Sequence, residues 1–336
     1  MFGLVLPGGV RGKREEIAQL TAPDLGEELA GPLAGFSICR NGLITAGRER
    51  AGRKNQTLDI LQRERTFMGR QSDLDIPVPV PGRTGPDHRF PIPGRDMEIS
   101  GHLIERGKQR VAGKIKDGKY IAYFQAFTGT YAPVERLEKL YMEAVNHPDV
   151  AVLSIATRPD CLSDDVLALL DKCNKIKPVW VELGLQTIHE KTAEYIRRGY
   201  ALPVYDEAVR KLRERNLEVI THVILGLPGE STEDMVDTVR YVCAHGTTGI
   251  KLQLLHILKG TDLEKEYNEG RVTPLTEDEY INVLKQCVSV IPDDVVIHRL
   301  TGDGDKKLLV APLWSADKKH VWNRIQKEVL ISDHIR

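Results

Sequence analysis

The sequence predicts an α/β fold built around a parallel β-sheet. From about residue 119, apolar runs rich in β-branched residues recur, and amphipathic segments with helix-capping residues lie between them. Successive runs begin roughly 30–40 residues apart, which is the length of one strand followed by one helix. This alternation favours either a (β/α) barrel, whole or partial, or a doubly wound open sheet.

Five apolar runs predict the strands of this sheet. They are nearly continuous in apolar residues, which is typical of strands covered by helices on a face. In chain order they are KYIAYFQAF (119–127), VAVLSIAT (150–157), VWVELGLQ (179–186), LEVITHVIL (217–225) and GIKLQLLHIL (249–258). Both candidate folds place their chemistry at the carboxyl ends of such strands.

Capping residues predict the helices between the strands. Pro133 is expected at the first position of one helix, where its missing N–H costs nothing, and Ser163 is expected to cap the next. Gly199 is expected to end the helix that contains EKTAEYIRR. Two pairs have capping-box spacing, namely Ser231 with Asp234 and Thr276 with Glu279.

Composition divides the chain near residue 98. Residues 1–98 contain twelve Arg, two Lys and nine Pro and show little periodicity, whereas residues 99–336 contain fourteen Arg and nineteen Lys and are regularly patterned. We therefore predict an irregular or disordered segment over 1–98, a core over 99–292 and a C-terminal extension over 293–336.

Charge and hydropathy exclude several classes of protein. The net charge of the 336 residues is −1, so no strong field favours nucleic acid or acidic membranes. No apolar run approaches the ~18 residues of a membrane span. The apolar stretch before Pro7 is too short for the hydrophobic region of a signal peptide. Five scattered cysteines fit reduced thiols. These features predict a cytoplasmic protein without a membrane partner.

Polar residues and glycines follow the predicted strands. In the turn GLPGE (226–230), two glycines and a proline would let backbone approach a flat ligand, although, taken alone, they are more often found in a plain strand-to-helix turn. Glu182 and Gln186 have equal parity on one strand, so they share a face and need either buried partners or a ligand. His222 and His256 fit core histidines as well as ligands.

Four segments together resemble the radical S-adenosylmethionine superfamily, in a branch similar to coproporphyrinogen dehydrogenase and the catalytic subunit of elongator. They are KDGKYIAYFQAFTGTYAPVERL (116–137), SIATRPDCL (154–162), VELGLQTIHEKTAEYIRRGY (181–200) and THVILGLPGES (221–231). The resemblance covers about residues 99–336. It implies a partial (β/α)6 TIM-like barrel, here without a recognisable first strand, with S-adenosylmethionine lying across the strand ends.

The resemblance also implies which residues contact the cofactor. The turn 128–130 would hold the methionine amino group, Glu182, Gln186 and Arg198 would reach the ribose and carboxylate, and the backbone of 224–230 would face the adenine. The full set of expected contacts is Thr128, Gly129, Thr130, Thr157, Arg158, Glu182, Gln186, Arg198, His222, Leu225, Gly226, Pro228, Gly229 and Glu230.

One part of the family's chemistry has no counterpart in the sequence. The family holds a [4Fe–4S] cluster on a Cys-x3-Cys-x2-Cys loop after the first strand, and an electron donor reduces it. Cys39 is the one cysteine in 1–98, and Cys161, Cys173, Cys243 and Cys287 are far apart, so no metal ligands are assigned. Our hypothesis is that 1–98 is an out-of-frame or misassembled stretch. The alternative is a lineage that lost the cluster.

Three functions are compatible with these features. The first is a radical enzyme that cleaves S-adenosylmethionine reductively to a 5′-deoxyadenosyl radical, inactive in this chain if the cluster is missing. Its substrate is unassigned, and the resemblance to the elongator subunit suggests RNA as a substrate. The second is a cluster-free protein that binds S-adenosylmethionine or a nucleoside. The third is a non-radical barrel enzyme with Glu182, His222 or His256 as acid and base. Catalytic residues and oligomeric state are unassigned.

Overall fold

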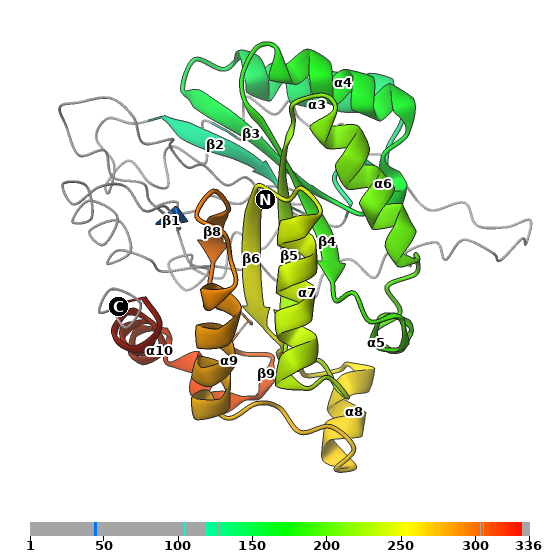
Figure 1. Ribbon diagram of the computed structural model, residues 1–336. Helices are drawn as coiled ribbons and strands as arrows, with labels where there is room; N and C mark the ends of the chain where they lie inside the picture. Colours follow the sequence, from blue (N-terminus) through cyan, green and yellow to red (C-terminus); the bar gives the residue numbers. More distant parts are fainter. Residues whose placement is uncertain are drawn as a thin grey trace, which may run out of the picture.

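A curled, parallel sheet forms the centre of the computed structural model, which describes residues 119–125, 128–302, 304 and 306–330, together with Ile104 and the backbone of Ile44–Thr45. The sheet has the strand order β1-β8-β6-β5-β4-β3-β2 (Figure 1). All strands except β1 run parallel, and β1 is antiparallel to β8. Because the parallel strands follow one another in chain order without reversal, the sheet is a half-barrel and not a doubly wound sheet.

The strand bounds agree closely with the apolar runs. The strands of this sheet are β1 (Ile44–Thr45), β2 (Tyr120–Phe124), β3 (Val150–Thr157), β4 (Val179–Gln186), β5 (Glu218–Leu225), β6 (Gly249–Leu254) and β8 (Val296–Arg299). The run predicted over 249–258 is divided, because β7 (Ile257–Leu258) leaves the main sheet. It pairs instead with β9 (Leu309–Ala311) in a small antiparallel sheet.

Helices connect successive parallel strands and cover the sheet (Figure 1). They are α3 (Val134–Asn146), α4 (Asp164–Asn174), α5 (Glu190–Tyr195), α6 (Leu202–Arg213), α7 (Thr232–Ala244), α8 (Asp262–Asn268) and α9 (Glu277–Ser289). After β9 follow the 3₁₀ turn η4 (Leu313–Ala316), helix α10 (Lys318–Ile325) and the π-helical turn η5 (Gln326–Leu330); a 3₁₀ turn, η3 (Pro159–Cys161), follows β3. None of the helices in the described part of the chain has the length and apolar character needed to cross a bilayer.

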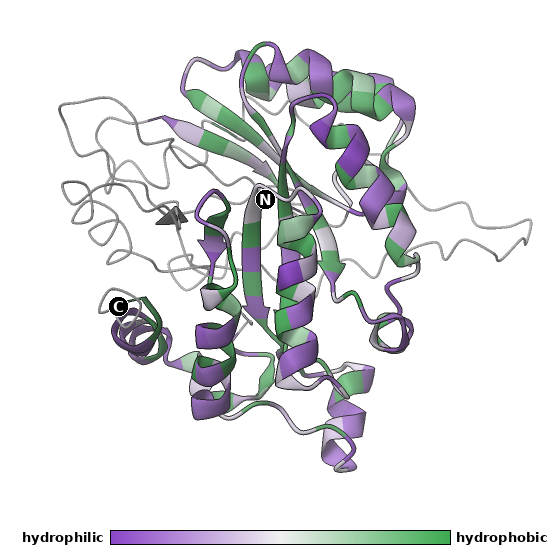
Figure 2. Cartoon of the chain, viewed as in Figure 1, coloured by the Kyte–Doolittle hydropathy of each residue, from purple (hydrophilic) through white to green (hydrophobic). Residues whose placement is uncertain are grey.

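Alternation along each strand separates two faces of the sheet. Leu153 and Ile155 of β3, and Val181 and Leu183 of β4, are fully buried in the core between the sheet and the helices. Figure 2 shows the helices, and the central strand β6, banded in hydrophobic and hydrophilic colours. The residues between them in sequence point to the concave face, where the structure places a polar network.

The capping residues explain most helix boundaries. The Ser163 hydroxyl accepts from the Val166 N–H, and both predicted capping boxes, at Ser231 and Thr276, are present. Pro133 precedes its helix by one position and serves as the N-cap. The Gly199 prediction was wrong, because α5 ends at Tyr195.

Part of the predicted C-terminal extension belongs to the main sheet. Strand β8 lies beside β6, and α10 packs on α9. The proposed division between residues 292 and 293 falls between α9 and β8 and stays a prediction. The irregular segment predicted over 1–98 lies outside the described residues, apart from Ile44–Thr45.

Candidate functional site at the carboxyl ends of the strands

A buried carboxylate organises the concave face of the half-barrel. Glu182 on β4 is 3% exposed, and its Oε2 accepts hydrogen bonds from Tyr123 Oη at 2.8 Å, His222 Nε2 at 2.7 Å and Lys251 Nζ at 2.5 Å. Its Oε1 accepts from Ser154 Oγ at 2.7 Å. The five side chains come from five adjacent strands, β2 to β6. We call them the Glu182 network.

The protonation states in the Glu182 network follow from its geometry. Burial alone would raise the pKa of the Glu182 carboxyl, but the Lys251 charge and the His222 hydrogen bond hold that pKa well below its ordinary value. Burial lowers the pKa of His222, although the carboxylate opposes this shift. The network therefore contains an anionic Glu182 and a neutral His222. Three of these four hydrogen bonds go to Oε2 and one goes to Oε1, so the protein saturates Oε2 and leaves Oε1 able to accept one more donor.

Two glutamines lie above the Glu182 network on the same face. Gln186 ends β4 with a positive φ of 68°, and a Cβ built on Gly184 would lie 2.9 Å from Gln186 Nε2. The Gln186 amide thus covers Gly184, which confirms that Gln186 shares the face of Glu182 despite a bulge between Gly184 and Gln186. Gln253 on β6 donates from Nε2 to His222 Nδ1 at 3.0 Å.

The turn after β2 is held against the end of β3. Gly129 N–H donates to Ala156 O at 2.8 Å, and a Cβ on Gly129 would lie 2.9 Å from the same oxygen. The Thr130 hydroxyl donates to Cys161 O at 2.6 Å and therefore accepts from Thr157 Oγ1, 2.5 Å away. These bonds join the turn to the end of β3 and to η3, and Thr128 is half-buried at the start of the turn.

Two arginines brace the turns after β3 and β4. Arg158 forms a bidentate pair with Asp160, at 2.9 and 2.7 Å, and donates from Nη1 to Arg198 O at 2.9 Å. Arg198 is buried, and its Nη1 donates to Thr187 O at 2.6 Å. Both guanidinium groups lie over the Tyr200 ring, at 5.4 and 4.8 Å from its centroid. The guanidinium groups of Arg158 and Arg198, which were expected to contact the ligand, therefore bond to backbone carbonyls and hold the two turns in place.

The turn after β5 has the geometry that its sequence predicts. Glu230 N–H donates to Leu227 O at 3.2 Å, and Gly229, which directly follows Pro228 as the third residue of the turn, has a φ of 85°, as a type II turn requires. Gly226 also has a positive φ, of 88°. The Leu225 side chain points into the hydrophobic core, so only its backbone belongs to this edge.

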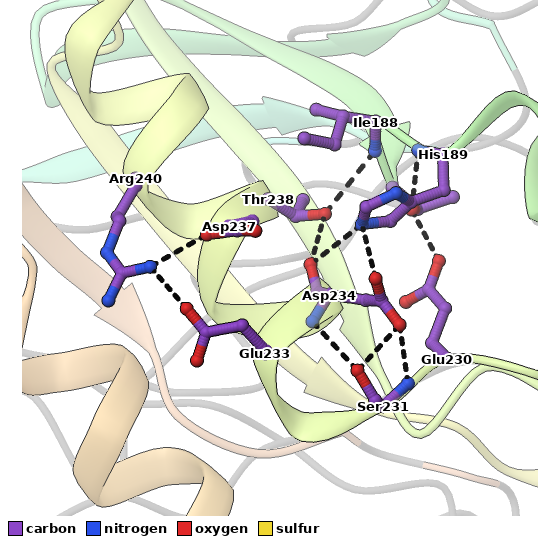
Figure 3. A network of polar contacts seen from close by, with 10 residues as sticks. Ile188, His189, Glu230, Ser231, Glu233, Asp234, Asp237, Thr238 and Arg240 are labelled. Atoms are coloured by element: carbon purple, nitrogen blue, oxygen red, sulfur yellow. Dashed lines mark hydrogen bonds and ion pairs between the residues drawn. The ribbon is translucent and has the colours of Figure 1, made fainter.

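Hydrogen bonds join the turn after β4 to the turn after β5 (Figure 3). The Thr187 hydroxyl donates to Glu230 Oε1 at 2.5 Å and accepts from His189 N–H at 3.1 Å. His189 Nε2 in turn donates to Asp234 O at 2.9 Å, in the first turn of α7. Burial raises the pKa of Glu230 above its ordinary value.

These turns form one hydrogen-bonded edge, which we call the rim: residues 128–130, 157–158, 186–187, 198 and 226–230. The set of contacts expected from the sequence contains every rim residue except Thr187 and Leu227. It missed Tyr123, Ser154, Lys251 and Gln253, which lie deeper on the concave face. A lysine within the apolar run GIKLQLL was the available signal for Lys251.

The described cysteines do not fit an iron–sulfur cluster. Cys173, Cys243 and Cys287 lie on α4, α7 and α9, and Cys161 ends η3. Burial raises the pKa of Cys173 to about 11, and those of Cys243 and Cys287 to about 12, so these thiols are protonated at neutral pH and are poor metal ligands. Within the described ranges, no group of three His, Cys, Asp or Glu side chains could hold a metal ion.

Comparison with known proteins identifies the family. A model described as the radical SAM superfamily matches residues 93–242, and the radical SAM C-terminal domain matches residues 247–330. The protein YtqA of Bacillus subtilis is 46% identical over 222 residues, which are 66% of this chain and 69% of YtqA. The chain belongs to the radical S-adenosylmethionine superfamily.

Two further proteins are similar to this chain. One is named for the modification of tRNA, and the other is a solved structure with the same fold. The tRNA uridine(34) acetyltransferase of Dehalococcoides mccartyi is 30% identical over 184 residues, 54% of this chain and 39% of that protein. The structure of archaeal Elp3 from Methanocaldococcus infernus superposes with a TM-score of 0.55 at 19% identity, over 68% of this chain and 61% of that chain. The second likeness confirms the half-barrel fold.

Membership of the superfamily implies S-adenosylmethionine and a [4Fe–4S] cluster as cofactors. The rim fits the first of these, because it offers glycine backbone and the Gln186 amide along one edge. The four cysteines that the structure describes do not fit the second.

Proposed function

We propose that this chain binds S-adenosylmethionine along the rim. The observation that carries the proposal is the continuity of the rim: the turn after β2 bonds to β3, Arg158 bonds to Arg198 O, and Thr187 bonds to Glu230. Four turns that follow four adjacent strands are thereby fixed relative to one another. A preordered edge of this kind lowers the cost of ordering a binding site around a flexible ligand.

Different residues of the rim would contact different parts of the cofactor. The backbone at Gly229 can approach a planar base closely, because nothing lies within 4 Å of the place where a Cβ would stand. At Gly226 that place is covered by the Leu275 side chain, 3.1 Å away. The Gln186 amide can bond the ribose or the carboxylate. In the Glu182 side chain, Oε1 accepts one hydrogen bond, from Ser154, and can accept a second from the ligand.

Reductive cleavage is a separate matter. In this superfamily the cluster supplies the electron that breaks the S–C5′ bond, and three thiolates hold it. The sequence has no two cysteines within three residues of each other. We therefore propose that this chain by itself binds the cofactor without cleaving it.

A second candidate is a complete radical enzyme, which the family membership favours. It requires a three-cysteine loop that residues 1–98 do not contain. Our hypothesis that 1–98 is out of frame is supported by the start of the family match at residue 93 and by the change of composition near the same point. RNA is the substrate class we propose for this enzyme, on the likeness to a tRNA uridine(34) acetyltransferase.

One experiment separates these candidates. The purified chain is treated anaerobically with iron and sulfide, titrated calorimetrically with S-adenosylmethionine, and then incubated with dithionite. Saturable binding without 5′-deoxyadenosine supports the cofactor-binding proposal. Formation of 5′-deoxyadenosine supports the radical enzyme, and absence of any binding overturns both.

A further inference from the structure

Gln253 lies between the Glu182 network and the rim. It belongs to β6 and is paired in register with Ile224 of β5, two residues beyond the pair of His222 with Lys251. Gln253 is half-buried, and it shares the parity of Lys251, whereas Leu252 and Leu254 face the helices. Ile224 leads directly into the turn at Gly226, so Gln253 is level with the start of the rim.

The orientation of the Gln253 amide is fixed by a chain of hydrogen bonds. Glu182 is an ionised carboxylate and can only accept, so His222 Nε2, 2.7 Å away, must carry a proton. In a neutral imidazole the other nitrogen, Nδ1, is then an acceptor. The Gln253 group 3.0 Å from Nδ1 must therefore be the NH₂.

This orientation leaves the Gln253 carbonyl oxygen directed away from His222. Within the part of the chain that the structure describes, no hydrogen bond to Gln253 Oε1 is present. A half-buried amide oxygen is stabilised when it gains a donor, because water reaches it incompletely. The Glu182 network thus fixes which end of the Gln253 amide faces His222 and leaves the amide oxygen as an acceptor, at the level of Ile224 on β5.

We propose that Gln253 positions a nucleoside ligand by accepting a hydrogen bond from one of its hydroxyl or amino groups at Oε1. This inference rests on the proposed function and adds a contact from β6, a strand that contributes no residue to the rim. The nucleoside is favoured because Gln253 is adjacent to the strand that leads into the glycine turn. Gln253 is a positioning residue that acts together with His222.

The test compares Gln253→Met, which keeps the length of the side chain and removes the amide, with Gln286→Met on α9 as a matched, half-buried control. We expect the first variant to bind S-adenosylhomocysteine roughly two- to twelve-fold more weakly, as loss of one neutral hydrogen bond requires, and the control to bind as the parent does. Equal affinity of Gln253→Met and the parent overturns the inference while leaving the proposed function intact. A parent that binds no nucleoside fails the proposed function itself.

Two additional measurements identify the group that is read and the orientation of the amide. Adenosine, 2′-deoxyadenosine and purine riboside, which lacks the amino group, are titrated into parent and variant. The loss of affinity caused by Gln253→Met should vanish for the analogue that lacks the donor group. A loss of affinity that is the same for all three analogues contradicts the assignment. Nitrogen NMR should show His222 protonated at Nε2. In Gln253→Glu the new carboxylate should raise the pKa of His222, and a proton at Nδ1 in the parent would contradict the orientation.

Discussion

The Lys251 ammonium lies 2.5 Å from Glu182 Oε2 in the interior of the half-barrel, with side-chain exposures of 10% and 3%. This ion pair joins β6 to β4 across β5, and Lys251 Nζ also lies 4.7 Å from the centre of the Tyr123 ring. A buried pair is stabilising only when its remaining hydrogen bonds are made, because both ions lose their water. Tyr123, Ser154 and His222 make those bonds for Glu182.

Removing the cation should therefore destabilise the fold strongly. In Lys251→Met we expect the free energy of unfolding, measured with urea at about pH 7, to fall by roughly 3–5 kcal/mol, since Glu182 stays buried without its counter-ion. Lys211→Met, which breaks the exposed pair with Asp164 at 3.5 Å, should change it by less than about 0.5 kcal/mol. The penalty of Lys251→Met should shrink as pH falls, because a protonated Glu182 needs no cation. Equal effects of the two substitutions would contradict this account.

His298 should make the fold sensitive to acid. Burial, together with the nearby Lys251 charge, lowers the pKa of His298 from 6.5 to about 3. Below pH 6.5 His298 is protonated in the unfolded chain, whereas in the folded chain it stays neutral down to about pH 3. The free energy of unfolding therefore falls across this window by about 1.4 kcal/mol for each unit of decreasing pH.

The variant His298→Phe keeps a ring against Trp180, whose centroid is 5.1 Å from that of His298, and removes the titrating group. Its free energy of unfolding should fall less steeply than that of the parent between about pH 6 and pH 4, where the slope is about 1.4 kcal/mol per unit for one such group. Parallel pH profiles for parent and variant would show that His298 is not the acid-sensitive group.

Two glycines of the rim should respond differently to substitution. A Cβ on Gly129 would lie 2.9 Å from Ala156 O and 3.0 Å from Ile155 Cγ2, so Gly129→Ala must shift the turn after β2, at a cost of about 1–3 kcal/mol in stability. Nothing lies within 4 Å of a Cβ on Gly229. Because asparagine tolerates positive φ, Gly229→Asn should cost about 1 kcal/mol or less. Thermal unfolding of both variants checks this, and the reverse order would contradict the geometry.

The origin of residues 1–98 is open to a direct check on the encoding DNA. If the segment is out of frame, one of the other two frames upstream of about codon 98 should encode a Cys-x3-Cys-x2-Cys peptide. If neither frame encodes one, the hypothesis fails and the lineage that lost the cluster becomes the explanation.

The sequence predicted the fold well because each strand and helix carries its own local signal. The runs at 150–157 and 179–186 coincide with β3 and β4, and the capping box at Ser231 sets the start of α7. Where a local rule failed, tertiary contacts were stronger. Gly199 has a positive φ of 80° but lies beyond the end of α5, where a Cβ would come within 3.3 Å of Arg158 Nη2.

The turns of the rim could be located from the sequence, whereas the partners of Glu182 could not. Glycines and polar residues mark the rim in the sequence, because they follow strands. The Glu182 network could not be derived, because pairing Lys251 with Glu182 requires the register of three strands, which no local pattern specifies. The roles of Arg158 and Arg198 as backbone braces depend likewise on contacts between separate turns.

Hydrogen–deuterium exchange with and without S-adenosylmethionine tests the central claim most directly. The account predicts slower exchange in the turns after β2, β3, β4 and β5, at 128–130, 157–158, 186–187 and 226–230, with α9 and α10 unchanged. Protection confined to other segments, or no change at saturating cofactor, would contradict a cofactor site along the rim.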